Sequence, residues 1–251
     1  MNKVARVDFS FWVMKVCATT LGETAGDLVS MTLGVGYALS STLLLGVFFV
    51  SLLAQLRARA FRPALYWTVI LTTSTAGTTM SDFIDRSLGL GYAKGSLILV
   101  SGLTTVLIAW RFFEGSLSVT HIEGRTEVFY WIAILFSNTL GTALGDFLAD
   151  DSGLGFLGSA ALIGALIALT AAAAWWTRLD RVVLFWIAFV LTRPFGATFG
   201  DLLTKPPEKG VLDFGTVGSS LVLASLLIVV GLVTSQAQGR ASESTGDSSS
   251  A

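Results

Sequence analysis

Four aspartates recur in the same context along this 251-residue chain, and they are the residues best suited to do chemistry. Each follows a tryptophan by 15 residues, with a glycine ten residues after the tryptophan and a glycine or serine directly before the aspartate. Carboxylates offer oxygen ligands to hard cations such as Mg²⁺ or Mn²⁺, and they can also carry protons. The four units are Trp12, Gly22, Gly26 and Asp27; Trp67, Gly77, Ser81 and Asp82; Trp131, Gly141, Gly145 and Asp146; and Trp186, Gly196, Gly200 and Asp201.

A polar stripe precedes each aspartate if these segments are helical, because residues four apart lie on nearly the same helix face. A carboxylate at the centre of a membrane costs about 2.5–3.5 kcal/mol on insertion scales, so four of them need water, a cation or one another. We therefore expect the stripes to line a permeation path or a binding site. The alternative is hydrogen bonding between helices, with each aspartate capping the next helix. The stripe residues, eight and four positions before each aspartate, are Thr19 and Glu23, Ser74 and Thr78, Asn138 and Thr142, and Arg193 and Ala197.

The fourth stripe differs from the others because it carries Arg193, which is followed by Pro194. An arginine inside a membrane needs a partner, and Glu23 or one of the four aspartates is the expected one. A fixed positive charge in the path argues against an open, nonselective cation pore. It suits a gated or coupled transporter, or a site for an anion. Lys15, near the start of the first helix, is expected to extend toward the membrane surface.

The elements that must position these residues are membrane-spanning helices. The chain is 53% hydrophobic and 13% charged, with a mean hydropathy of +0.73, which is typical of a polytopic membrane protein. A span needs about 20 apolar residues, and eight such runs lie at roughly 9–29, 37–56, 65–84, 92–112, 128–148, 154–175, 182–203 and 215–233.

Each repeat thus contains two predicted helices, and the fold class is an all-α integral membrane protein with eight transmembrane helices. The repeated aspartates are 55, 64 and 55 residues apart, which indicates a two-helix unit doubled and then doubled again. A polar, Ser-rich tail without apolar periodicity is expected to be disordered and cytoplasmic. The predicted boundaries are a membrane domain at 1–235 with repeats at about 9–56, 65–112, 128–175 and 182–233, and a tail at 236–251.

The placement of positive charge predicts the orientation in the membrane. Ten Lys and Arg residues fall at the termini or between repeats, and four fall in the opposite turns. This favours both termini in the cytoplasm. Two spans per repeat also make the repeats parallel, so four hairpins should form a pseudo-fourfold bundle around an axis along the membrane normal.

The tryptophans and glycines of the repeat have structural interpretations. The 15 residues from Trp to Asp correspond to about 22 Å of helix, so each tryptophan is expected to act as an anchor at the cytoplasmic interface. The paired glycines, with Ser81 replacing one of them, allow helix backbones to approach closely, so we interpret them as packing residues. Neither residue type is expected to take part in chemistry.

Several classes of protein are disfavoured by the composition. The net charge of −1 selects no nucleic acid partner. The single cysteine, Cys17, excludes an internal disulfide and a thiolate metal cluster, and the single histidine, His121, excludes a multi-histidine metal site. The chain contains no cofactor fingerprint and no nucleophile–base pair. We expect no cofactor and no enzymatic activity, with a membrane enzyme as the third alternative.

The fourfold unit resembles a family of bacterial inner-membrane proteins with four tandem repeats of unknown function. In that family each repeat has two transmembrane regions and a characteristic tryptophan, which corresponds here to Trp12, Trp67, Trp131 and Trp186. The resemblance covers about residues 9–233. It implies a bacterial inner-membrane protein but supplies no activity, and the fourth repeat departs most from the pattern.

The leading functional hypothesis is a small-solute transporter or channel for a cation, either a divalent metal or a proton. Asp27, Asp82, Asp146 and Asp201 would bind the ion or relay charge, with Glu23 assisting. The alternative is a non-transporting membrane scaffold or sensor that acts through partner proteins. Apart from the lipid bilayer and a possible inorganic cation, the sequence specifies no partner, and it does not determine the metal, the direction of transport or the oligomeric state.

Overall fold

The structure is a computed structural model that describes residues 3–119, 122, 124–205, 212 and 214–247. Only the backbone is described from residue 235 to residue 247. Within these ranges the chain forms eight α-helices and three short π-helical segments, which confirms the all-α prediction. The α-helices are α1 (Phe9–Asp27), α2 (Tyr37–Arg57), α3 (Pro63–Asp82), α4 (Gly91–Glu114), α5 (Arg125–Asp146), α6 (Gly155–Trp176), α7 (Arg181–Thr204) and α8 (Thr216–Asp247).

The repeated aspartate marks the point at which three of the helices change their winding. Helices α1, α3 and α5 end at the aspartate, and a π-helical segment of five residues follows each of them. The chain then turns sharply on glycines with positive φ, for example 81° at Gly36 and 72° at Gly91, a conformation that glycine adopts without a steric cost. The π-helical segments are Leu28–Thr32, Phe83–Ser87 and Phe147–Asp151.

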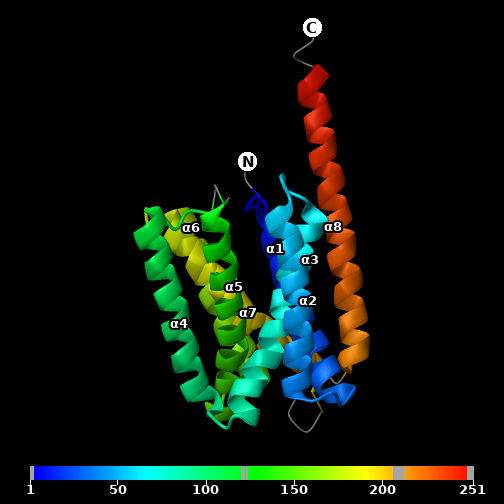
Figure 1. The fold of residues 1–251 in the computed structure, drawn as a ribbon, viewed down its shortest axis with the longest axis vertical. Coiled ribbons are helices and arrows are strands. Elements are labelled where there is room, and N and C mark those ends of the chain that lie inside the picture. Colours follow the sequence, from blue (N-terminus) through cyan, green and yellow to red (C-terminus); the bar gives the residue numbers. More distant parts are fainter. Residues whose placement is uncertain (1–2, 120–121, 123, 206–211, 213, 248–251) are drawn as a thin grey trace.

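The first helices of the four repeats form a closed inner ring. Helix α1 packs against α3, α3 against α5, α5 against α7, and α7 against α1. The second helices lie outside this ring, where α2 packs on α3, α4 on α5, α6 on α7 and α8 on α1 (Figure 1). Each outer helix therefore packs mainly against the first helix of the next repeat. The sequence predicted hairpins within a repeat, so the repeat in the sequence is not the unit of packing.

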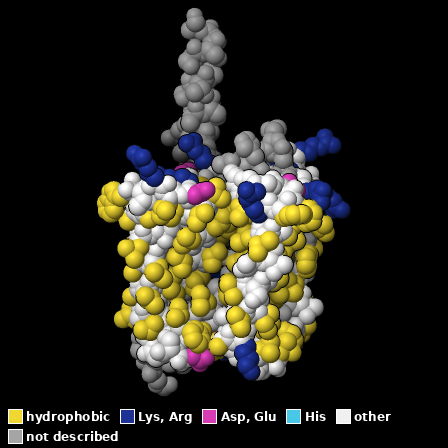
Figure 2. Space-filling view, turned by 90° about the vertical axis from the view of Figure 1, so that its left-hand side faces the viewer, with side chains coloured by type: hydrophobic (Ala, Val, Ile, Leu, Met, Phe, Trp, Pro, Cys, Tyr) yellow, Lys and Arg dark blue, Asp and Glu magenta, His cyan; other side chains and the backbone are white. Residues whose placement is uncertain are grey.

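Six of the helices in the described part of the chain are long and apolar enough to cross a membrane, namely α2 and α4 to α8. Helices α1 and α3, which the sequence also predicted as spans, are not among these six, and the fold buries their polar stripe residues in the inner ring. Figure 2 shows hydrophobic side chains along the flanks of the molecule. In the same view most of the Lys and Arg side chains gather at one end of it.

Helix α8 extends past the bundle on the side where the N-terminus also lies (Figure 1). It continues to Asp247, beyond Gln236, where the sequence predicted the start of a disordered tail. The added segment, residues 236–247, contains two residues each of Ala, Gln, Ser and Gly, so it includes two glycines, which carry a large helix penalty. Residues 248–251 of the predicted tail lie outside the described residues.

The repeated glycines lie where the inner helices meet. A Cβ atom at Gly26 would lie 2.8 Å from the Thr78 Cβ atom, and one at Gly196 would lie 2.8 Å from the carbonyl carbon of Thr19. A side chain in place of Gly26 or Gly196 would therefore clash at the α1–α3 or the α7–α1 contact. Gly77 lies at the α3–α5 contact and Gly141 at the α5–α7 contact. These positions fit the packing role that the sequence predicted for the glycines.

Replacement of Gly196 by Ala should destabilise the protein, because the new methyl group would meet backbone atoms of α1 that cannot move independently. We expect a loss of about 1–3 kcal/mol, as for overpacked cores, seen as a lower thermal unfolding temperature in detergent. Gly46→Ala in α2 is the matched control, because a Cβ atom there has open space within 4 Å. Equal unfolding temperatures for the two variants would contradict this assignment.

Candidate functional site

A buried cluster at the centre of the inner ring takes one residue from each of its four helices. The Nη2 atom of Arg193 lies 2.9 Å from Glu23 Oε2, 2.5 Å from Thr78 Oγ1 and 2.6 Å from Thr142 Oγ1. The two threonine hydroxyls in turn lie 3.3 and 3.2 Å from the same Glu23 oxygen. These residues form the central cluster. The sequence-predicted partnership of Arg193 with Glu23 is confirmed, and the four stripes do converge.

The environment of the central cluster explains why the ion pair persists. Arg193 is fully buried and Glu23 is 3% exposed. A buried charge is costly unless it is paired and its remaining polar atoms are hydrogen-bonded. The guanidinium group also donates to the carbonyl oxygens of Thr19 and Ser74, at 3.4 Å each. The contacts therefore join all four inner helices and fill the axis at this level.

The four repeated aspartates are all buried, and two cationic side chains connect them in pairs. The Lys205 ammonium lies 2.8 Å from Asp27 Oδ2 and 3.3 Å from Asp201 Oδ1. The Arg86 guanidinium lies 3.0 Å from Asp82 Oδ1 and 3.5 Å from Asp146 Oδ2. We call this group of four carboxylates the aspartate cluster, without implying that all of its members touch.

Both cations occupy the same place in their repeats, four residues after the aspartate. The corresponding residues of the first and third repeats are Met31 and Asp150. Cations therefore alternate with other residues around the bundle, and each one spans the boundary between two repeats. The sequence did contain a signal for these ion pairs, because each cation follows an aspartate by four residues, which is one helical turn. We had predicted that the helices end near the aspartates, so this spacing was not used.

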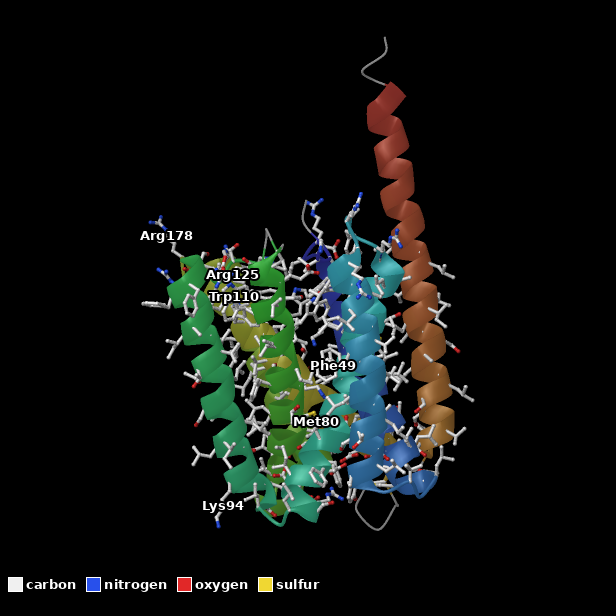
Figure 3. The ribbon with its side chains drawn as sticks, in the orientation of Figure 1. Phe49, Met80, Lys94, Trp110, Arg125 and Arg178 are labelled. Atoms are coloured by element: carbon white, nitrogen blue, oxygen red, sulfur yellow. The ribbon has the colours of Figure 1, made fainter. Side chains whose placement is uncertain are left out.

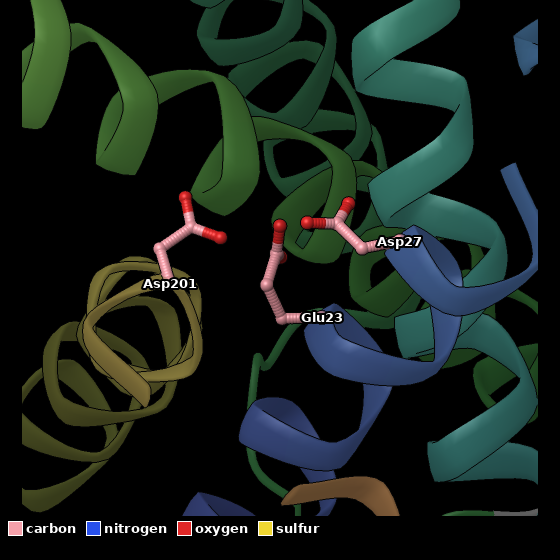
Figure 4. Close-up of side chains that lie close together, drawn as sticks. All are labelled: Glu23, Asp27 and Asp201. Carbon is pink, nitrogen blue, oxygen red and sulfur yellow. The ribbon is translucent and has the colours of Figure 1, made fainter. Parts of the chain in front are cut away.

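Three carboxylates are close enough to bind one metal ion together. Ligand atoms of Glu23, Asp27 and Asp201 lie within 4.8 Å of one another, and all three residues are buried. Figure 4 shows the three side chains converging from α1 and α7. Carboxylate oxygens suit a hard divalent ion, so the arrangement fits the expected chemistry. The Lys205 ammonium contacts two of these three groups, which shows that the position stabilises a positive charge.

The opposite end of the inner ring contains buried aromatic side chains. Tyr66 and Tyr130 are fully buried, and their hydroxyl oxygens lie 2.7 Å apart. Three of the repeated tryptophans, Trp67, Trp131 and Trp186, are also buried at this end, whereas Trp12 is partly buried. The sequence predicted that the tryptophans anchor the protein at the cytoplasmic interface, and this stays a prediction. In the structure the buried rings also contribute to the packing of the bundle, where they contact neighbouring aromatic rings.

Lys15 is the polar residue that the sequence placed least well. It was expected to extend toward the membrane surface, yet it is fully buried. Its ammonium lies 4.1 Å from the centroid of the Phe189 ring. Lys15 precedes Thr19 by four residues, so it continues the first polar stripe by one turn. The four-residue spacing from Thr19 could have predicted that Lys15 faces the inner ring. We assumed instead that a lysine side chain reaches water.

Loss of one partner of the central ion pair should be more damaging than loss of both. Arg193→Met leaves Glu23 as an uncompensated buried charge, which typically costs about 3–5 kcal/mol. The double variant Glu23→Gln with Arg193→Met removes both charges, so we expect it to unfold at a higher temperature than the single variant. Thermal unfolding in detergent measures both. A double variant less stable than Arg193→Met would contradict the assignment.

Comparison with known proteins assigns the chain to a family through its four repeats. The match is to a family described as a Repeat of Unknown Function (DUF347), at residues 10–61, 65–116, 129–180 and 184–239. No curated protein and no solved structure matched the chain. The four matched segments correspond to the four units that share the tryptophan, the glycines and the aspartate. The chain therefore belongs to the DUF347 repeat family.

Proposed function

We propose that the protein is a multi-pass protein of a bacterial inner membrane, with eight spans and both termini in the cytoplasm. Six apolar helices support membrane insertion, and α1 and α3 would cross as inner spans shielded by their neighbours. Figure 3 supports the orientation, because Arg125 and Arg178 lie at the end near the N-terminus, whereas Lys94 lies at the other end. Cytoplasmic loops are enriched in positive charge.

We infer that the bundle transports a small solute, specifically a cation. The observation that carries this inference is the surplus of buried negative charge on the axis. Among the described residues, five carboxylates, those of the aspartate cluster and Glu23, form ion pairs with three cationic side chains, Arg193, Arg86 and Lys205. Two negative charges remain, which one divalent metal ion or two protons would neutralise. A buried surplus of this kind is costly without such a ligand.

The described conformation corresponds to a state of such a transporter that is closed between the aspartate cluster and the end near the termini. The central cluster fills the axis in its middle, and the Tyr66–Tyr130 pair closes the end near the termini. An ion at the aspartate cluster would reach the other side only after both closures separate. Alternating closure of this kind suits a gated or coupled transporter better than an open channel.

A second function is supported by the same closures. A bundle whose axis is filled by hydrogen-bonded side chains is also suited to be a rigid scaffold or a sensor that acts through partners. The contacts of the central cluster favour that alternative if they never open. The two functions differ in whether an ion crosses the membrane.

Ion flux in proteoliposomes separates the two functions. Wild type and a variant with Asn at all four positions of the aspartate cluster should be compared with Mg²⁺, Mn²⁺, monovalent cations and a proton gradient. We expect flux of a divalent ion or protons in wild type and at least about a tenfold loss in the variant. Asp151→Asn, at an exposed acid near the same end, is the control. Absence of flux in folded, inserted wild type would favour the scaffold.

The Lys205 ammonium should compete with a metal ion for Asp27 and Asp201. Burial disfavours the charge, but the two carboxylates raise the pKa of Lys205 well above its ordinary value, so the side chain stays positive at neutral pH. Lys205→Gln should therefore tighten Mn²⁺ binding by about tenfold, or about 1.4 kcal/mol. Electron paramagnetic resonance titration of free Mn²⁺ measures this, with the exposed Lys94→Gln as control. Unchanged affinity would exclude the competition.

A further inference from the structure

A second group of buried polar atoms lies on the inner ring, on the tyrosine side of the central cluster. The Lys15 ammonium, the Ser74 hydroxyl and both polar atoms of the Asn138 amide have no hydrogen-bond partner among the described residues. The Nε atom of Arg193 is also without one. All four residues are fully buried. Buried polar groups in proteins are almost always hydrogen-bonded, so this concentration of orphans needs an occupant.

The residues belong to two successive levels of the inner ring. Ser74, Asn138 and Arg193 each lie eight residues before the aspartate of their repeat, and each packs against a repeated glycine of the preceding inner helix. Lys15 lies twelve residues before Asp27, one turn further along the axis. The contact of its ammonium with Phe189, which is also twelve residues before its aspartate, fixes the Lys15 side chain at that level.

In the described part of the chain, no acid forms an ion pair with Lys15. The other residues of its level are Ile70, Ile134 and Phe189, all apolar and fully buried. On its own helix the nearest acid of the stripe is Glu23, eight residues and about 12 Å away, and Glu23 is already paired with Arg193. Two basic side chains, Lys15 and Arg193, therefore lie near this level, and the Glu23 carboxylate pairs with Arg193.

We propose that Lys15, Arg193, Asn138 and Ser74 form a binding site for one small monovalent inorganic anion such as chloride. The orphaned groups are mainly donors: an ammonium, a guanidinium N–H, an amide NH₂ and a hydroxyl. A halide ion accepts hydrogen bonds from several of these donors at once, and its negative charge would stabilise the protonated form of Lys15. A divalent oxyanion would bring one negative charge too many.

This site is separate from the proposed cation site. The aspartate cluster lies about 18 Å further along α1 by helix rise, and it has an excess of negative charge. The central cluster lies between them. The bundle thus presents one region suited to an anion and one suited to a cation along the same axis. Anion binding does not depend on whether the protein transports cations.

Equilibrium binding of radiolabelled chloride to the purified protein in detergent tests the proposal. Gluconate should replace chloride at constant ionic strength, and no cation gradient is involved. We expect saturable binding of one chloride per chain in wild type and in Lys94→Met, which removes an exposed lysine at the far end. Lys15→Met should weaken binding by at least about tenfold, and Asn138→Ala should weaken it less.

Stability supplies an independent readout for the same proteins. Chloride should raise the thermal unfolding temperature of wild type relative to gluconate, because a ligand that binds only the folded state stabilises it. This rise should disappear in Lys15→Met, which replaces a buried amine by an apolar side chain of similar length and so should remain folded. Absence of chloride binding in wild type, or equal chloride binding in Lys15→Met, would overturn the proposal. Binding lost equally in Lys94→Met would assign it to the surface.

Discussion

The ion pair between Arg193 and Glu23 is the interaction on which the interior of this bundle depends. Two charges inside a membrane-sized bundle are tolerable only when each is paired and hydrogen-bonded. Thr78 and Thr142 complete that requirement, since each contacts both partners. The four residues come from the four repeats, so the pair can be satisfied only when the inner ring is closed. The electrostatic constraint therefore specifies the tertiary arrangement.

Glycine makes this constraint possible. Side chains as short as threonine can reach an arginine on another helix only if the backbones approach closely, and the repeated glycines provide that approach at each contact of the ring. The fourfold pattern of the sequence thus builds a nearly symmetric frame. The charges then break the symmetry. Arg86 and Lys205 occupy alternate repeats, and Arg193 occurs in one repeat only. The alternation agrees with the spacing of the aspartates, which indicates that a two-helix unit was duplicated and the product was duplicated again.

The sequence predicted the parts of this structure that depend on local pattern. The bounds expected for the second span, 37–56, nearly coincide with Tyr37–Arg57, and the stripe correctly indicated which face of α1 turns inward. Packing between helices carries no such local signal. A hydrophobic run does not indicate which helix it packs against, so the packing of α2 on α3 could not be predicted. The position of Lys15 near the start of a helix likewise did not indicate that it is buried. The partners of the aspartates were missed because Arg86 and Lys205 lie in predicted turns.

Glu23 belongs to both charged regions of the axis, and this has a consequence for the proposed function. It is the partner of Arg193 in the central cluster, and it is also one of the three carboxylates that can bind a metal ion with Asp27 and Asp201. A cation at that position would draw negative charge away from Arg193 and weaken the contact that closes the axis. Removal of the cation would restore the contact between Glu23 and Arg193. If a cation binds at the proposed site, its occupancy and the closure of the axis would be linked through this one carboxylate.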